Sequence, residues 1–212
     1  EGAGTTVGDR TSNGNNGTMK NMDPATDWVQ QADGSWVLDF DGTNDYVDLC
    51  ADTDLRPYTD LTVFVRFMST SPHQQRGVMG HVTDGSMSPR WGLRHNAGGA
   101  LRLFGHVDNT VIELLTTNTI ISEQWHSAAF AHSVDTGTQL FMDGAAEDSS
   151  PKTGEFTRAD FTNRVQVGCY STDPRLRGAV DCAIIYTRAL SAAEIAAHHL
   201  MYSDPATWAQ AG

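Results

Sequence analysis

Hydrophobic and polar residues alternate with a period of two along much of the chain from residue 36 onward. Such alternation is typical of β-strands, because successive side chains point to opposite faces. In residues 61–68 large side chains occupy both sets of positions, which predicts a strand covered on each side, as in a sandwich interior or a concave groove. Similar runs predict strands at residues 36–40, 45–49, 77–82, 90–94, 100–107, 111–116, 124–134, 138–142, 164–168 and 178–186.

Turn sequences separate these runs. The stretch 41–44 (Asp-Gly-Thr-Asn) predicts a hairpin between residues 36–40 and 45–49, and Asp143-Gly144 after residues 138–142 is a second signal of this kind. Turn signals recur at roughly 8–12-residue intervals, which is typical of a sandwich or a barrel.

The two ends of the chain differ from this pattern. Residues 1–35 are rich in loop-forming residues, while Ser191 and Glu194 form a capping box that predicts a helix to about Met201, before Pro205. We find no internal repeat and no linker. The sequence therefore predicts one all-β domain over residues 1–212, with a short C-terminal helix.

The charge excludes one large class of partner. The chain of 212 residues has 14 Lys and Arg against 26 Asp and Glu, a formal net charge of −12. This surplus repels phosphate backbones and argues against nucleic-acid binding. No apolar run approaches the roughly 18 residues of a membrane helix, so we expect no membrane insertion. The sequence opens at Glu1 on turn residues, without a signal peptide.

Three cysteines, Cys50, Cys169 and Cys182, are too few and too odd in number for a disulfide framework. One interpretation is three small buried thiols. The alternative is a single bridge, from Cys169 to Cys182. The redox compartment stays open.

Three stretches, in order, resemble the signatures of laminin-G-like, concanavalin A-type jelly rolls. They are residues 1–18 (EGAGTTVGD, then NGNNGT), residues 38–47 (LDFDGTNDYV) and residues 177–195 (RGAVD, then IYTRALSAAEI). Residues 125–130 and 140–144 stand where that family has its central strands. The chain departs from the family at residues 10–12, where Arg-Thr-Ser replaces a run of small residues.

The resemblance implies a two-sheet antiparallel jelly-roll sandwich with one concave sheet. Members serve as glycan- or protein-binding modules or spacers in secreted, cell-surface and virion proteins. Residues 198–208 also resemble the ending of bacteriophage-encoded copies. We therefore expect an extracellular, cell-surface or virion location.

A calcium ion is the expected cofactor. Asp9, Asn13 and Asn15 supply oxygen ligands from one polar loop, as calcium prefers. The resemblance implies that this loop lies beside the closing strand, which would bring Asp181 to the same place. Asp181 also stands among apolar neighbours, where a lone charge is costly. The alternative is that the loop residues form Asx turns and that Asp181 binds a backbone amide.

A sugar-binding surface needs aromatic rings and forked hydrogen-bonding groups. Trp91, flanked by Arg90 and Arg94 with His95 following, is the main candidate, and Arg66 is the fourth predicted ligand residue. Phe64, Phe104 and His106 are further candidates for the concave sheet. The alternative is that Trp91 shields a sheet edge.

Catalysis has little support in the sequence. The Glu-x-Asp-x-x-Glu motif of the laminarinase-like branch is absent, and so is a Gly-x-Ser-x-Gly elbow. We therefore predict a non-catalytic recognition or adhesion module that binds glycan or a protein surface. The alternative is a structural virion component, such as a capsid decoration, fibre or tail-associated domain with capsid or tail proteins as partners. A polysaccharide-degrading enzyme is the minor alternative.

Overall fold

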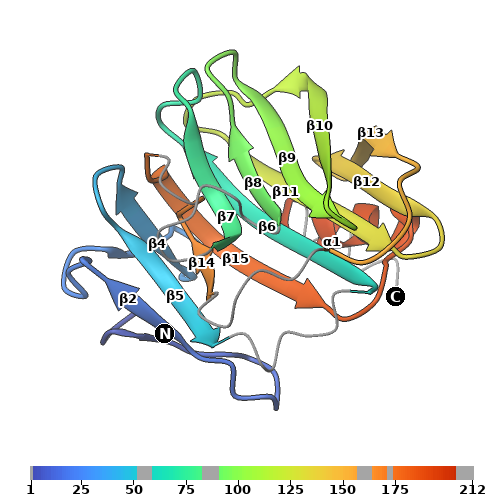
Figure 1. Cartoon of the computed structure of the whole chain (residues 1–212). Coiled ribbons are helices and arrows are strands. Elements are labelled where there is room, and N and C mark those ends of the chain that lie inside the picture. Colours follow the sequence, from blue (N-terminus) through green and yellow to red (C-terminus); the bar gives the residue numbers. More distant parts are fainter. Residues whose placement is uncertain (1, 52–58, 83–90, 157–163, 171–173, 204–212) are drawn as a thin grey trace.

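The computed structural model describes residues 2–51, 59–82, 91–156, 164–170 and 174–203. In this part of the chain, strands form two antiparallel sheets that pack face to face, and one helix lies on the outside (Figure 1). The predicted two-sheet jelly-roll sandwich with a C-terminal helix is confirmed.

One sheet has eight strands. In spatial order they are β1 (Thr6–Val7), β2 (Gly17–Lys20), β5 (Tyr46–Ala51), β14 (Arg164–Val167), β7 (Arg76–Val82), β8 (Trp91–His95), β9 (Ala100–Val107) and β10 (Thr110–Thr119).

The other sheet has seven strands. Their order is β13 (Ala145–Ser150), β12 (Gly137–Met142), β11 (Trp125–Ser133), β6 (Leu61–Ser69), β15 (Arg177–Tyr186), β4 (Trp36–Asp41) and β3 (Trp28–Gln30).

The main core lies between the two sheets and consists of the inward residues of the alternating strands. Its largest fully buried side chains include Phe40, Phe67 and Phe130. A second, smaller core lies on the outer side of the seven-stranded sheet, where Phe64 and Phe141 pack with Ile195 of α1 (Ala192–Ser203). The prediction that β6 is covered on both faces is therefore confirmed.

The capping box also forms as predicted. Glu194 N donates to Ser191 Oγ at 3.3 Å, and Ser191 N donates to the Glu194 carboxylate at 2.8 Å. Hydrogen bonding from Arg188, with that from Ser191, lowers the pKa of Glu194 to about 2. The four strands that the pattern did not predict, β1, β2, β3 and β13, lie in polar or mixed sequence.

The two Asp-Gly turns have different outcomes. Asp143 and Gly144 both have positive φ, of 50° and 78°, and connect β12 to its hairpin partner β13. The predicted hairpin at residues 41–44 is wrong, because β4 and β5 belong to different sheets. That turn carries the chain across the sandwich, and a tight turn alone does not specify whether the next strand pairs with the previous one.

Cys169 is buried and Cys182 is half-buried, and both are free thiols, so the alternative of a bridge between them is wrong. Burial raises the pKa of Cys182 to about 11. The side chain of Cys50 lies outside the description. Among the described residues, no helix has the length and apolarity that crossing a membrane requires.

Candidate functional site

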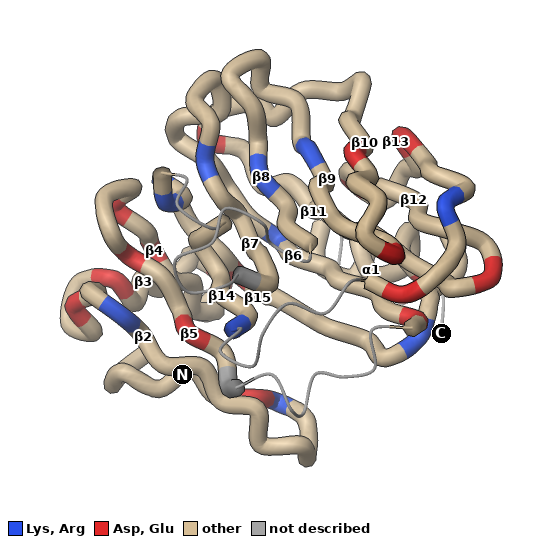
Figure 2. Tube along the Cα trace, viewed as in Figure 1, with Lys and Arg blue, Asp and Glu red and all other residues tan. Residues whose placement is uncertain are grey.

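The outer side of β8, β9 and β10 carries an alternating set of polar and aromatic side chains. Leu93, Leu103 and Leu114 point into the core from adjacent positions, so their neighbours along each strand point outward. Figure 2 shows basic positions on β8 and β9 and an acidic position on β10. We call this surface the open face; its strand residues are Gly92, Arg94, Arg102, Phe104, His106, Val111, Glu113 and Leu115.

Phe104 lies near the middle of the open face, between Gly92 and Glu113 in the cross-strand register. Its half-buried ring meets the His106 ring edge-on, with 5.3 Å between centroids. The Arg102 guanidinium lies 5.4 Å from the Phe104 centroid and 2.7 Å from the Glu113 carboxylate. One aromatic ring thus stands beside forked donors and an acceptor, the combination that a sugar ring and its hydroxyls require.

Two exposed apolar side chains flank this cluster. Val111 is 52% exposed beside His106, and Leu115 is 39% exposed beside Arg102. An apolar group at the surface costs little singly, but a group of them around polar residues marks a contact surface.

Tyr170 lies across the inner part of the open face, where the glycines of β7 and β8 leave room. A Cβ atom at Gly92 would collide with the Tyr170 ring, and one at Gly77 would collide with its backbone. The Arg94 guanidinium lies 5.1 Å from the Tyr170 centroid. Alternation along the strands could have placed Arg102 and Glu113 beside Phe104, but no local pattern predicts Tyr170.

The predicted ligand residues of β8 do not lie on one surface. The Trp91 ring is 2% exposed and packs against Phe130 in the core, and His95 is fully buried with its Nε2 3.2 Å from Ser69 Oγ. Burial lowers the pKa of His95 to about 4. Trp91 and His95 thus face away from any ligand on the surface, because they alternate with Arg94, which does lie on the open face. Trp91 is therefore not an exposed platform, and Phe104 rather than Trp91 presents an aromatic ring on the open face.

The fourth predicted ligand residue, Arg66, lies on the other side of the sandwich. It points outward from β6, forms an ion pair with Asp181 at 2.8 Å and covers the Trp125 ring at 4.6 Å from the centroid. The structure therefore does not bring Arg66 together with Arg94.

The predicted calcium ligands have partners of their own. The Asp9 carboxylate accepts hydrogen bonds from Thr11 N and Thr11 Oγ1, each at 2.8 Å, and from Asn15 N at 2.9 Å. The Thr11 bonds are the main cause of the lowered pKa of Asp9. The Asx turn foreseen for Asp9 is thus present. Asp181 binds the Arg66 side chain rather than a backbone amide.

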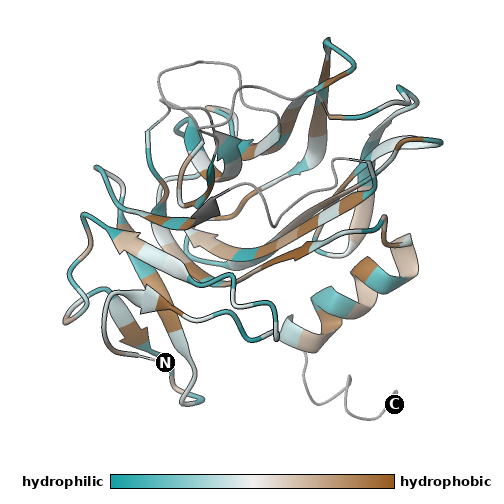
Figure 3. Cartoon of the chain, turned by 60° about the horizontal axis from the view of Figure 1, so that its bottom comes forward, coloured by the Kyte–Doolittle hydropathy of each residue, from teal (hydrophilic) through white to brown (hydrophobic). Residues whose placement is uncertain are grey.

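The N-terminal loop does lie near the end of α1 (Figure 3), where the charge of Arg10 acts to lower the pKa of Tyr202 against the larger effect of burial. The described residues contain no cluster of three or more His, Cys, Asp or Glu suited to a metal. The predicted set combines two Asp with two Asn, and calcium at Asp9, Asn13, Asn15 and Asp181 stays a prediction.

A family model described as the concanavalin A-like lectin/glucanases superfamily matches residues 41–196. The chain belongs to this superfamily. No curated protein matches it in sequence.

Solved structures show the same fold at low sequence identity. The binding domain of Paraclostridial Mosquitocidal Protein 1 is 14% identical with a TM-score of 0.68, over 94% of this chain and 52% of that one. Domain 4 of AbnA, a GH43 extracellular arabinanase from Geobacillus stearothermophilus in complex with arabinotriose, is 16% identical with a TM-score of 0.63, over 91% and 85%. A structure from a study of ganglioside-dependent cell entry by botulinum neurotoxin type C is 9% identical with a TM-score of 0.63, over 92% and 50%. The chain thus spans about half the length of two of these structures.

The superfamily's name covers both lectins and glucanases. Whether the open face could hydrolyse a glycosidic bond depends on the distance between its carboxylates. Glycosidases place two carboxylates roughly 5–9.5 Å apart. At described outward strand positions of the eight-stranded sheet, the two acids are Glu113 on β10 and Asp48 on β5, whose side chain is held 2.5 Å from Arg164. Five strand spacings separate β5 from β10, about 24 Å, so these two cannot act on one glycosidic bond.

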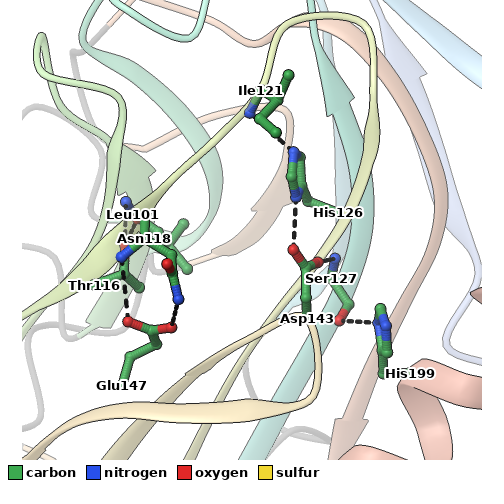
Figure 4. Close-up of polar contacts among 9 residues, drawn as sticks. All are labelled: Leu101, Thr116, Asn118, Ile121, His126, Ser127, Asp143, Glu147 and His199. Carbon is green, nitrogen blue, oxygen red and sulfur yellow. Dashed lines mark hydrogen bonds and ion pairs between the residues drawn. The ribbon is translucent and has the colours of Figure 1, made fainter.

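Ser127, His199 and Asp143 also lie near one another, but they do not form a catalytic relay (Figure 4). Ser127 Oγ lies 2.9 Å from His199 Nδ1, but the Asp143 carboxylate binds His126 Nδ1 at 2.8 Å and Ser127 N at 2.9 Å. In a relay the carboxylate orients the histidine that contacts the serine. Ser127 is also buried. These bonds instead attach α1 and the β12–β13 turn to β11.

Proposed function

We propose that this chain is a non-catalytic recognition module that binds glycan through its open face, on a secreted protein or a virion surface. The observation that carries the proposal is the half-buried Phe104 ring, with Arg102 and His106 beside it and Glu113 opposite it. The ring offers a surface for the C–H face of a sugar, while the guanidinium and the carboxylate bind its hydroxyls.

The fold neighbours support this direction. One is a domain in complex with arabinotriose, and another comes from work on a toxin whose cell entry depends on gangliosides. At sequence identities of 9–16%, these neighbours do not indicate which ligand this chain binds. The support therefore rests first on the chemistry of the open face.

The test is a glycan array, followed by calorimetry with the strongest ligand. Phe104→Ala is expected to weaken binding by about tenfold or more, because stacking and its desolvation contribute roughly 1–3 kcal/mol. The matched control is Ile121→Ala, which removes an exposed apolar side chain outside the open face. A ligand that binds Phe104→Ala as tightly as the control would refute the proposed site, and an array without signal would refute glycan binding.

A structural role in a virion is the second candidate function, with assembly contacts and no sugar ligand. Val111 and Leu115, exposed on β10, would suit an assembly contact as well as a ligand. Size-exclusion chromatography separates the two. A stable ring or trimer that Leu115→Asp dissociates supports assembly, whereas a glycan-binding monomer supports recognition.

A further inference from the structure

A cleft of about 540 Å³ lies on the outer side of the seven-stranded sheet, next to the residues that lead into α1. Its lining includes Ala189 and Leu190, which precede α1, and Pro151, which follows β13. The rest of the lining comes from β11, β12, β13 and the β11–β12 turn. The cleft and the open face are on different sheets, so a ligand in one does not touch the other.

The cleft exists because α1 covers only part of the sheet and because the side chains beyond it are short. Ala129 and Phe141 are opposite one another in the register and are buried beneath α1. The next outward row along the strands consists of Ala131, Gln139 and Ser149, which line the cleft. A sheet surface lined by alanine and serine leaves a hollow where larger side chains would fill it.

Gly137, at the start of β12, is a lining residue whose backbone conformation requires glycine. Its φ of +92° is unfavourable for other residues, and a Cβ atom there would collide with the Ser150 carbonyl oxygen. The strand β12 can therefore approach the end of β13 closely only with glycine at this position.

The lining is rich in hydrogen-bonding groups and contains no charged side chain. Within the described part of the chain, the side chains of Thr136, Gln139 and Ser149 form no hydrogen bond. The hydroxyl of Ser133, on the outward side of β11 with Ala131, accepts from the backbone N–H of Asp135 at 3.3 Å, which leaves its own proton to donate. The cleft thus offers both donors and acceptors to a ligand.

We infer that this cleft is a second binding site, one that holds a single neutral saccharide residue. Sugar hydroxyls donate and accept at once, as the hydroxyl and amide groups of the lining do. An anion would find no cation in the lining and a chain of net charge −12, and a cation would find no carboxylate. Leu190 and Pro151 supply apolar contact, and the volume lies in the range of about 300–1,000 Å³ that is typical of small-ligand sites.

The inference does not depend on the proposed role of the open face. Together, the two sites would allow one module to hold two glycan chains on different sheets, which raises the avidity for a polysaccharide surface. Either site can fail its test without affecting the other.

The test is nuclear magnetic resonance on the ¹⁵N-labelled chain, titrated with the methyl glycosides of glucose, galactose, mannose and arabinose. Saturable shifts are expected at the Gln139 side-chain amide and at the Gly137 backbone amide. Methyl glucuronide and methyl glucosaminide are the charged comparators, and we expect them to bind more weakly than the matching neutral sugars.

Variants then assign the site. Gln139→Ala is expected to raise Kd about tenfold through the lost hydrogen bonds, and Ser149→Ile to abolish binding by filling the cleft from an exposed position. Gln30→Ala, an exposed glutamine on β3 of the same sheet, and Phe104→Ala on the open face should leave Kd unchanged. The inference is overturned by an absence of shifts with every neutral glycoside, by tighter binding of a charged comparator, or by a Gln139→Ala variant that binds like the wild type.

Discussion

The two outer surfaces of the sandwich come from the same alternating pattern but differ in what covers them. On the seven-stranded sheet, Phe64 points outward and is nevertheless fully buried, because α1 lies over it and its Tyr202 ring is 6.0 Å away. On the eight-stranded sheet, Phe104 also points outward, but it stays half-exposed beside Arg102 and Glu113. An outward aromatic residue is thus buried by packing or left exposed on the surface according to what covers it, and only an exposed one is available for the ligand contact proposed at Phe104.

The largest expected effect tests this contrast directly. Phe64→Ala removes a fully buried ring and leaves a cavity under α1, which should lower the free energy of unfolding by about 3–5 kcal/mol. Phe104→Ala, the matched change on the open face, should lower it by about 1 kcal/mol or less. Urea denaturation measures both. Similar losses for the two variants would contradict the assignment of Phe64 to packing and Phe104 to ligand contact.

The free energy of unfolding should decrease at acid pH because of one histidine that is buried in the core and one that is half-buried on α1. Burial lowers the pKa of His95 to about 4, and burial also lowers that of His199 on α1. A lowered histidine pKa means that the fold favours the neutral form. Its stabilising contribution is complete above about pH 6.5 and is lost as the pH falls towards the folded-state pKa. For His95 alone the loss by pH 4 is roughly 3 kcal/mol.

Urea midpoints measured from pH 7 to pH 4 check this prediction. Around His199, the Asp143 charge acts to raise the pKa, while Arg66 and His126 act to lower it. His199→Gln should therefore reduce the fall in stability, whereas Phe104→Ala should leave the slope unchanged. A wild-type midpoint that does not vary with pH would show that the buried histidines are not linked to unfolding.

Calcium should stabilise the region where the N-terminal loop comes near the end of α1. A single site at Asp9, Asn13, Asn15 and Asp181 would add about 2.7 kcal/mol at a calcium concentration of 100 Kd, seen as a rise in Tm after chelator treatment. Asp181→Asn should remove the calcium response. Without calcium it should cost about 3 kcal/mol or less, since the broken ion pair with Arg66 is only partly buried. No rise in Tm, with no metal by elemental analysis, would refute the site.

The smallest expected effect concerns the edge where the two sheets meet (Figure 4). The Glu147 carboxylate of β13 accepts hydrogen bonds from Thr117 N at 2.9 Å, from Thr117 Oγ1 at 2.7 Å and from the Asn118 side chain, all on β10. Glu147→Gln keeps the shape but loses the charge, and should cost about 1 kcal/mol. Glu155→Gln, at an exposed position, is the control. Equal unfolding midpoints for the two variants would show that this contact contributes nothing.

Most strands could be predicted because alternation is a local property. The strand predictions at residues 61–68 and 100–107 match β6 and β9 within one residue. In β8 the same alternation places Trp91 and His95 on the face opposite to Arg94, because odd and even positions face opposite ways, so the predicted grouping of these three residues on one surface is wrong. The outward place of Phe104 and His106 could be read from alternation, but their exposure could not.

Other features depend on contacts between distant residues. Asp41-Gly42 and Asp143-Gly144 have similar local sequences, yet one turn crosses between sheets and the other closes a hairpin. Tyr170 reaches the open face only because Gly77 and Gly92, far away in the sequence, leave space for it. No local pattern carries this information.

The local elements follow from the amino-acid sequence alone: the alternating strands, the capped helix and the tight turns. These depend on backbone preferences and on side chains a few residues apart. Three other features depend on the folded chain: which side of each strand is covered, the pairing of Arg66 with Asp181, and the place where short side chains leave a cleft. Those outcomes depend on which segments pack together, since burial and hydrogen bonding are properties of the assembled sheets rather than of any one strand.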